Sequence, residues 1–517
     1  MSISLETIKF PKPVLAVFLI ICAQVLIFQP HKYGFAPGHH GWVSSHNSAI
    51  IINSIPENCF SGYSLRFYNH EKLEYDYFVR NSVLFSAIIK IVLFPLEPYP
   101  RWWVYSARQI MNIIFLLSIA AVWLLLVQAG FSPYLSAAVS AILFSSFTFV
   151  YFRDMIHYDQ IAVLCAIMFA RALLISKQTG NNRKVLFWGI LAPQLGRGYA
   201  VIPFFVFWLF LDILFFQTGV KISIRQKLKI LIRHPAVFLS ACSVFLLTSA
   251  IGLNVVTEAK LRQISWEKTS VIDSMLRRSG ISSSYNVSWK FYIRQQARRF
   301  PKLFVPCAAN LFWKQNKIPK FLLAAFPLFL MGSAVFSLLI IIRREKIVFR
   351  HPVVQTLTIL VCGASAWMFF MKNLVAFHSY TSMYYWPSAL VICLLALRFL
   401  PARPIFFISA FLLFASLGMN ITSESWKAAR YNSAADSIIS IISRLPDSPQ
   451  TAVFIEGGYQ GLFNGCPYAA GFFLHRQSIA TDINKADFII TSGPRPGALY
   501  QDDNFSLING YSFSKKK

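Results

Sequence analysis

The run VLAVFLIICAQVLIF, residues 14–28, has no charged side chain, and Gln24 is its only amide. Lys9 and Lys12 precede the run, and no small-residue cleavage site follows it. We therefore expect an uncleaved first membrane helix rather than a removed signal peptide. Similar runs recur along the 517-residue chain, which is 56% hydrophobic and 14% charged. Soluble domains carry about 25% charged residues, so the sequence predicts an α-helical polytopic membrane protein.

The apolar runs predict about eleven transmembrane helices by their length. They cover about residues 13–30, 106–128, 133–152, 158–176, 185–196, 200–217, 236–255, 321–342, 352–371, 382–398 and 404–420. Another run, VLFSAIIKIVLFPL at 83–96, is too short to cross a bilayer comfortably. We expect it to lie as a helix in the membrane interface.

Lysine and arginine set the expected orientation. The net charge is +28, but no nucleic-acid recognition motif accompanies it. Four short basic loops, at 176–184, 220–234, 343–351 and 398–404, share one side if the N-terminus is cytoplasmic, as the positive-inside rule requires. Nearly all acidic residues and histidines then lie on the other side. We therefore expect any chemistry on the outer face.

Three large segments belong to that outer face, at 31–105, 256–320 and 421–517. In the last, TAVFIEGG and ADFIITSG are typical of strands that end in glycine, and prolines punctuate the chain. We expect a transmembrane domain over residues 1–420 and a small outer α/β domain over residues 421–517.

Three histidines fall close together after the first apolar run. His39, His40 and His46 lie in PGHHGWVSSHN, residues 37–47. They suit a metal site, an active site or a polar loop that leaves the bilayer. Imidazole and carboxylate together suit several divalent ions, but the spacing shows no tight ligand pattern. A divalent metal is therefore an open alternative rather than a prediction.

An acidic stretch in the same outer segment suits general-base chemistry. NHEKLEYDYF, residues 69–78, contains Glu74 and Asp76. Acids this close repel one another, and a nearby apolar surface raises their pKa values. A raised pKa makes a carboxylate a usable base. The alternative is a solvated acidic turn.

Two further outer junctions contain candidate residues. In YFRDMIHYDQIA, Asp159 fits helix capping, whereas Asp154 either carries chemistry or pairs with the arginine beside it. In MKNLVAFHSYTSMYYWP, the aromatic residues are typical of a membrane interface. His378 and Tyr380 in that stretch suit either a substrate contact or a structural role.

Four basic residues are candidate phosphate ligands. Arg197 lies between two apolar runs in APQLGRGYAVIP, and an arginine at membrane depth is costly and often functional. Its alternative role is snorkelling to the interface. Arg298, Arg299 and Lys302 lie in the basic, aromatic stretch SWKFYIRQQARRFPKLF. Arginine binds phosphate oxygens in a bidentate manner, and the alternative is anchoring to anionic lipid.

The chain lacks a P-loop, a GxGxxG after a strand, an HExxH and a GxSxG motif. Its layout resembles the GT-C superfamily of membrane glycosyltransferases, mainly the protein O-mannosyltransferase-like and lipid A aminoarabinose transferase-like branches. The resemblance rests on the acidic first outer loop with interfacial helices, the helix YSARQIMNIIF, the outer turn FRDMIHYD, the stretch GRGYA and the late NLVAFHSY.

This resemblance implies transfer of a sugar from a polyprenyl-phosphate carrier to a glycan, lipid or protein acceptor on the outer face. Cations must stabilise the lipid phosphate that leaves, a role that Arg197 and the cluster Arg298, Arg299 and Lys302 fit. A carboxylate must accept the acceptor proton. The family usually has an acid just after the first helix, where this chain has GHHGW.

The base is then either His39 or His40, or an acid further along, chiefly Glu74 or Asp76, with Asp154 as a third choice. We favour the acids at 74–76, with His39, His40, His46, Asp159, His378 and Tyr380 as substrate-site residues. The resemblance implies a bacterial plasma membrane, with the C-terminal domain periplasmic. The alternative functions are a transporter or flippase of a lipid-linked glycan and a non-catalytic protein of the same fold.

Overall fold

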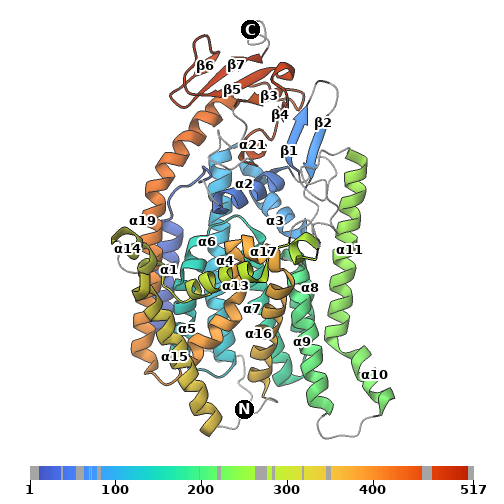
Figure 1. The fold of residues 1–517 in the computed structure, drawn as a ribbon, viewed down its shortest axis with the longest axis vertical. Coiled ribbons are helices and arrows are strands. Elements are labelled where there is room, and N and C mark those ends of the chain that lie inside the picture. Colours follow the sequence, from blue (N-terminus) through green and yellow to red (C-terminus); the bar gives the residue numbers. More distant parts are fainter. Residues whose placement is uncertain are drawn as a thin grey trace.

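The computed structural model describes residues 11–36, 39–53, 63–68, 70, 73–77, 83–196, 198–217, 223–261, 276–281, 286–316, 320–344, 351–456 and 468–510. Figure 1 shows a bundle of long helices with a β-sheet at one end, opposite the N-terminus. The long helices are α1 (Lys12–Ile27), α4 (Pro100–Gln128), α5 (Pro133–Ser145), α7 (Tyr158–Thr179), α8 (Arg183–Leu195), α9 (Gly198–Gln217), α11 (Pro235–Leu261), α15 (Lys320–Arg344), α16 (Pro352–Phe370), α18 (Trp386–Leu397) and α19 (Ala402–Ile442).

Shorter helices connect and cap the bundle. They are α2 (His39–Ile52), α3 (Val83–Leu93), η2 (Phe94–Leu96), α6 (Phe147–Phe152), α10 (Ile224–Arg233), α13 (Trp289–Arg299), η3 (Phe300–Leu303), α14 (Cys307–Asn316), α17 (Lys372–Phe377), η4 (Ser379–Tyr385), α21 (Tyr468–Phe473) and η5 (Ile483–Lys485). The apolar run at 83–96 forms α3 and η2, where Ile91 and Val92 are exposed. Its predicted place in the membrane interface stays a prediction.

Five helical segments among the described residues are long and apolar enough to cross a membrane. They are α4, α7, α16, α19 and Ser379–Leu397, which joins η4 to α18. A sixth is added if α10 and the first part of α11, bent by 51° at their junction, form one span. Helices α1 and α5 are apolar but shorter. The chain is therefore an integral membrane protein, while the eleven spans stay a prediction.

Two predicted helices differ from the structure. The single helix expected at 133–152 is split at Ser146, whose backbone is extended (φ −62°, ψ 152°). Ser146 forms a β-bridge with Pro306, and the Phe147 N–H donates to the Val305 carbonyl at 3.0 Å. These backbone bonds from a distant segment replace helical ones, so the helix divides into α5 and α6.

The last predicted span is longer than expected. Helix α19 has 41 residues and continues to Ile442 instead of ending near residue 420. At 1.5 Å per residue it is about 60 Å long, twice the roughly 30 Å hydrocarbon core. Its C-terminal half therefore extends beyond the core and reaches the sheet (Figure 1). The expected domain boundary at residue 421 falls within this helix.

The sheet has seven strands in the order β2-β1-β4-β3-β5-β7-β6. The strands are β1 (Tyr63–Tyr68), β2 (Leu73–Tyr77), β3 (Ala452–Ile455), β4 (Ser478–Ile479), β5 (Phe488–Ser492), β6 (Tyr500–Gln501) and β7 (Phe505–Asn509). Strands β1, β4, β3 and β5 are parallel to their neighbours within this group, with Val453 opposite both Ile479 and Phe488. Strands β2, β7 and β6 pair antiparallel. Both strands predicted near the C-terminus are present, as β3 and β5.

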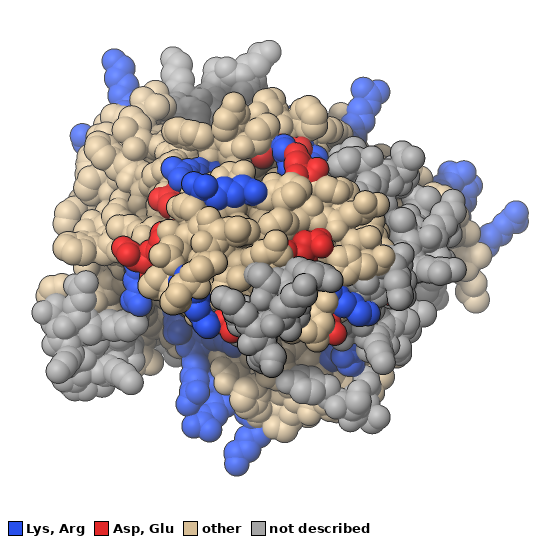
Figure 2. All heavy atoms as spheres, turned by 90° about the horizontal axis from the view of Figure 1, so that it is seen from above, with Lys and Arg blue, Asp and Glu red and all other residues tan. Residues whose placement is uncertain are grey.

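Strands β1 and β2 come from the first outer segment, so two segments far apart in sequence share one sheet. An apolar core fixes this sheet onto the helices. It contains Trp103 of α4, Phe472 of α21, Ile438 of α19 and Phe67 of β1. Seen from this end, acidic and basic side chains are interspersed over the surface (Figure 2). The sheet end is thus a polar, mixed-charge cap on an apolar bundle.

Candidate functional site

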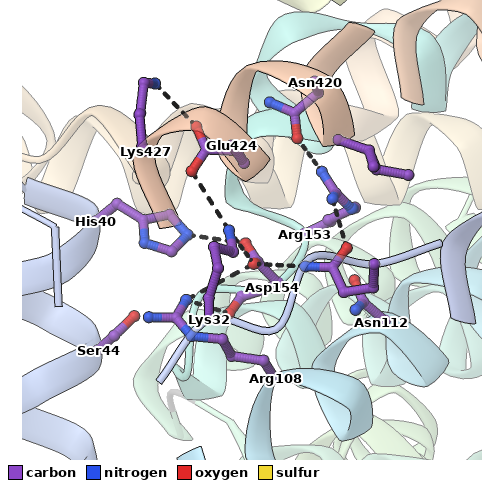
Figure 3. Close-up of polar contacts among 12 residues, drawn as sticks. Lys32, His40, Ser44, Arg108, Asn112, Arg153, Asp154, Asn420, Glu424 and Lys427 are labelled. Carbon is purple, nitrogen blue, oxygen red and sulfur yellow. Dashed lines mark hydrogen bonds and ion pairs between the residues drawn. The ribbon is translucent and has the colours of Figure 1, made fainter. Parts of the chain in front are cut away.

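Asp154 is the centre of a buried polar cluster in the turn between α6 and α7. Its carboxylate is 1% exposed, and Lys32 Nζ lies 2.5 Å from its Oδ2. His40 Nε2 lies 3.1 Å from Oδ1, and Arg108 Nη1 lies 3.7 Å from Oδ2. Gln29 Nε2 donates to Oδ2 at 3.1 Å. Figure 3 shows Lys32, His40 and Arg108 pointing toward this carboxylate from separate parts of the chain. We refer to Gln29, Lys32, His40, Arg108 and Asp154 as the Asp154 cluster.

Local structure explains how each cation reaches this carboxylate. Lys32 lies in the extended segment that leaves α1, and His40 lies in the first turn of α2. Arg108 lies on the buried stripe of α4, together with Trp103, Ala107 and Met111. Residues three and four apart on a helix share a face. The packing of α4 therefore carries Arg108 into the interior.

The charges in the cluster determine the protonation of Asp154. Burial alone would raise the pKa of its carboxyl, but Lys32, then His40 and Arg108, outweigh burial and hold the pKa well below its usual range. Burial lowers the pKa of Lys32, and Asp154 and Glu424 oppose that effect. Burial also lowers the pKa of His40. Asp154 is therefore ionised, and His40 is neutral at pH 7.

A second carboxylate and a third buried cation flank the cluster. Glu424 of α19 lies 3.4 Å from Lys32 Nζ and 3.0 Å from Lys427 Nζ. Arg153 is fully buried; it donates to Gln29 Oε1 at 2.7 Å, to the Val150 carbonyl at 3.0 Å and to Asn420. Asp154 thus pairs with distant cations rather than with the adjacent Arg153.

The buried groups leave an excess of positive charge. Lys32, Arg108 and Arg153 are cationic, and Asp154 and Glu424 are anionic, so these five side chains carry a net charge of about +1 with His40 neutral. In a low-dielectric interior such a charge attracts an anion more strongly than it would in water. The arrangement suits an anionic group that docks beside Lys32 and Arg108.

The predicted histidines have different surroundings. His40 is in the Asp154 cluster and also packs against Tyr151 and Phe152. His46 is buried in α2 and stacks on Trp42, with ring centroids 5.7 Å apart. His39 begins α2. Within the described part of the chain, no group of three or more His, Cys, Asp or Glu could hold a metal ion.

The two acids that the sequence favours as the general base lie in the sheet rather than in the Asp154 cluster. Glu74 and Asp76 belong to β2, the edge strand of the sheet, where Glu74 is opposite Phe67 and Asp76 is opposite Leu65. Figure 1 shows β2 on the side of the molecule away from α19, whereas Glu424 of α19 contacts the Asp154 cluster. The structure therefore brings His40 and Asp154 together but places the acids of residues 74–76 on the sheet.

Asp159 and the late outer junction form a separate contact. Asp159 is fully buried in the first turn of α7, and Tyr384 of η4 donates to its Oδ1 at 2.6 Å. His157 Nδ1 lies 2.9 Å from Asp159 Oδ2. Tyr380 packs against both His157 and His378. These contacts join η4 to the start of α7.

The basic residues that were predicted to bind phosphate lie in different surroundings. Arg299 donates to the Val375 carbonyl, to Ala376 O at 2.9 Å and to His378 O at 3.4 Å, which are acceptors at the C-terminal end of α17. Cations are favourable at that end of a helix. Arg298 and Lys302 are exposed, and Lys302 lies 5.6 Å from the Phe147 ring centroid. Arg197 lies outside the described residues.

Sequence reasoning missed Lys32, Arg108 and Glu424 as members of the site. The sequence contains an indication of the role of each of these three residues. Lys32 is a cation immediately after an apolar helix on the side where the positive-inside rule does not call for one. Arg108 and Glu424 are ionisable residues within or beside predicted membrane helices, where such groups are costly and often functional.

Comparison with known proteins adds to this geometry. No protein-family model and no curated protein matches the sequence. The fold resembles ArnT from Cupriavidus metallidurans bound to undecaprenyl phosphate, with a TM-score of 0.59 and 10% identity over 96% of this chain and 98% of ArnT. It also resembles the apo oligosaccharyltransferase of Archaeoglobus fulgidus, with a TM-score of 0.50 and 13% identity over 93% of this chain and 69% of that one. Both are GT-C glycosyltransferases. The predicted GT-C resemblance is thus confirmed at the level of the fold.

Proposed function

We propose that the chain is a glycosyltransferase that moves a sugar from a polyprenyl-phosphate donor to an acceptor at the sheet end of the molecule. The Asp154 cluster carries this proposal, because it places Lys32 and Arg108 in a buried site with excess positive charge. The likeness to a structure whose ligand is undecaprenyl phosphate supports the same class of donor. We place the sheet end in the periplasm of a bacterium, in keeping with the basic loops.

The leaving group in such a reaction is a polyprenyl phosphate. Negative charge develops on the phosphate oxygen as the bond to the sugar breaks. Lys32 and Arg108 stabilise that charge, and their effect is large because the site is buried. Asp154 and Glu424 hold the Lys32 ammonium group between them before the substrate binds. The carboxylates therefore position a cation that acts on phosphate.

His40 is the general base in this proposal. Asp154 is a poor base because its cationic neighbours hold its pKa well below the usual range, so its carboxylate has little affinity for a proton. A neutral His40 donates its Nε2–H to Asp154 Oδ1, which leaves the Nδ1 lone pair to accept a proton. The acceptor hydroxyl oxygen bonds to the anomeric carbon, the bond from that carbon to the phosphate oxygen breaks, and the hydroxyl proton passes to His40 Nδ1. Asp154 orients the ring and stabilises the imidazolium.

We assign the exposed Arg298 and Lys302 to binding of the lipid donor at the membrane surface rather than to the chemical step. They lie in and directly after α13, a helix whose Trp289 and Phe291 are also exposed. Aromatic and basic side chains together favour the headgroup region of a membrane. We assign Arg298 and Lys302 to attraction of the phosphorylated lipid, and Arg299 to the structure around α17.

Reconstitution tests this function directly. Purified protein in liposomes with a radiolabelled polyprenyl-phosphate sugar should release polyprenyl phosphate and transfer or hydrolyse the sugar, and Lys32→Ala should slow both about 10²–10³-fold. A flippase would instead move a fluorescent lipid-linked sugar across the bilayer without cleaving it. Cleavage that is unchanged by Lys32→Ala would refute the site, and the absence of cleavage with every donor sugar tried would refute the function.

A further inference from the structure

A polar groove of about 570 Å³ opens at Tyr33, the residue that follows Lys32 of the Asp154 cluster. It lies between α19, the segment after α1, the start of α4 and the end of the sheet. Its lining residues are Tyr33, Arg101, Ala429, Asn432, Ser433, Asp436, Ser437, Ser440, Tyr500 and Asp502. The groove is open to solvent and large enough for several sugar rings, since ligand pockets of ordinary size are about 300–1,000 Å³.

The walls of this groove are held by specific bonds. The Tyr33 hydroxyl donates to Asp436 Oδ2 at 2.8 Å, and Arg101 Nη2 lies 2.7 Å from Asp436 Oδ1. The backbone N–H groups of Tyr33 and Gly34 both donate to Asn432 Oδ1 at 3.1 Å. These bonds fix the segment after α1 onto α19. The groove is therefore preformed by ordered side chains.

The lining chemistry favours a neutral ligand rich in hydroxyl groups. In the described part of the lining Arg101 pairs with Asp436, and Arg444, whose guanidinium lies 4.1 Å from the Tyr500 ring centroid, offsets Asp502, so the charges at the groove nearly balance. Without an excess of positive charge, the groove has no strong attraction for phosphates or acidic chains. Serine and tyrosine hydroxyls, the Asn432 amide and the carboxylates offer both donors and acceptors. Arg101 lies 5.5 Å from the Tyr33 ring centroid and Arg444 lies 4.1 Å from the Tyr500 ring centroid, so a guanidinium group holds each ring on one face.

The groove and the Asp154 cluster are built on the same two chain segments. Lys32 and Tyr33 are consecutive: Lys32 binds Asp154, and Tyr33 lines the groove. On α19, Glu424 binds Lys32, while Asn432 binds the backbone of Tyr33. A ligand in the groove therefore lies beside the segment that carries the phosphate-binding lysine.

We propose that this groove binds the acceptor of the reaction and that the acceptor presents a neutral, polyhydroxylated glycan to it. The inference rests on the proposed glycosyl transfer, because it assigns the second substrate of that reaction. The lipid phosphate belongs to the positive Asp154 cluster, and the neutral glycan belongs to the groove, where the charges nearly balance. The excess positive charge of the cluster therefore draws the donor phosphate there rather than into the groove.

Ser433→Trp tests the groove with little risk to folding, since Ser433 is exposed on α19 and an indole there would fill the space. Ser425→Trp is the matched control, because Ser425 is also exposed on α19 but does not line the groove. The purified full chain is applied to a glycan microarray that carries neutral and acidic oligosaccharides. Hydrolysis of a polyprenyl-phosphate sugar is measured in parallel, and thermal unfolding verifies that each variant is folded.

We expect the wild-type chain and Ser425→Trp to bind neutral glycans, and Ser433→Trp to bind them at least tenfold more weakly while its donor hydrolysis is unchanged. Binding only to acidic glycans, binding to none, or full binding by Ser433→Trp would overturn the proposal. Loss of donor hydrolysis in folded Ser433→Trp would also overturn it, because the groove would then hold the donor.

The two proposals can fail separately. Glycan binding that depends on Ser433, in a chain that cleaves no donor, would leave a neutral-glycan site and refute the glycosyltransferase function. Donor cleavage that depends on Lys32, without any glycan binding, would support the function and refute the groove.

Discussion

The Lys32 ammonium nitrogen lies 2.5 Å from Asp154 Oδ2, and both side chains are buried. Neither charge is stable alone in this interior, because removal of one partner leaves the other desolvated and uncompensated. The pair thereby holds the segment after α1 against the turn before α7. The same lysine contacts Glu424 of α19, so one cation joins three parts of the chain at the proposed active site.

The mutual dependence of this pair predicts the stability of variants. Asp154→Asn should destabilise the protein by about 3–5 kcal/mol, because Lys32 then remains buried beside Arg108 without its main counter-charge. The double variant Lys32→Met with Asp154→Asn should recover part of that loss. Thermal unfolding in detergent measures both. Lys32→Met alone completes the cycle, and a double variant whose destabilisation equals the sum of the two single effects would show that the two charges are not coupled.

Lys32 should matter more for the chemical step than for donor binding. Lys32→Ala should lower kcat about 10²–10³-fold, the usual effect of removing one group that stabilises transition-state charge, while KM changes little. Lys32→Arg should keep part of the activity because it keeps the charge. The control is Lys290→Ala, which removes an exposed cation of α13. An equal loss in the control would point to a general electrostatic effect.

His40 predicts the pH dependence of the reaction. A general base must be unprotonated, which for histidine is the neutral form, and burial lowers the pKa of His40 below its ordinary value of 6.5. Activity should therefore be flat above about pH 6.5 and fall only in more acidic solution, as the imidazole becomes protonated. In His40→Gln, which keeps a polar side chain, kcat should drop about 10²–10⁴-fold and the acidic limb should disappear. An unchanged acidic limb in this variant would assign the base to another group.

The acids of β2 provide the complementary experiment. If His40 is the base, Glu74→Gln and Asp76→Asn should each keep kcat within about twofold of the wild-type value. If a carboxylate of β2 is the base instead, one of these variants should lose about 10²–10⁴-fold in kcat, the usual contribution of general-base catalysis. The reconstituted transfer assay decides between them. Circular dichroism confirms that the edge strand is intact in each variant.

Local patterns predicted the parts of the structure that depend on nearby residues. The length of the apolar runs predicted helices such as α4 and α7, and short apolar stretches that end in glycine predicted β3 and β5. Asp154 and His40 were also identified, because polar residues at helix junctions of an apolar chain stand out. The split at Ser146 was missed because its cause is a backbone bridge to Pro306, which no local pattern contains.

The contacts that build the site are non-local. Lys32, Arg108, Asp154 and Glu424 come from four separate segments, and only the packing of α4, α7 and α19 brings them together. The pairing of β1 with β4 is non-local in the same way. This pairing places β1 and β2 in the same sheet as the C-terminal strands. The acidic composition of residues 69–78 could not reveal that position.

His475 predicts an acid-sensitive element in the sheet end of the molecule. Its Nδ1–H donates to the Phe472 carbonyl at 3.2 Å, and Arg476 Nε donates to its Nε2 at 3.3 Å, so the ring is neutral. Burial, and then Arg476, lower its pKa from 6.5 to about 4. Above pH 6.5 the ring is neutral in both the folded and the unfolded chain, and this contribution to stability is fully present. Below pH 6.5 the unfolded chain binds the proton first.

The stability contributed by His475 should therefore be lost as the pH falls from about 6.5 to about 4, by about 3 kcal/mol in total. Thermal unfolding between pH 7 and pH 5 avoids most of the carboxylate titration. In His475→Gln, which cannot be protonated, the unfolding temperature should depend less on pH over that interval. His351→Gln is the control, because His351 is exposed at the start of α16. Equal slopes in the wild type and His475→Gln would show that the acid sensitivity arises from other groups.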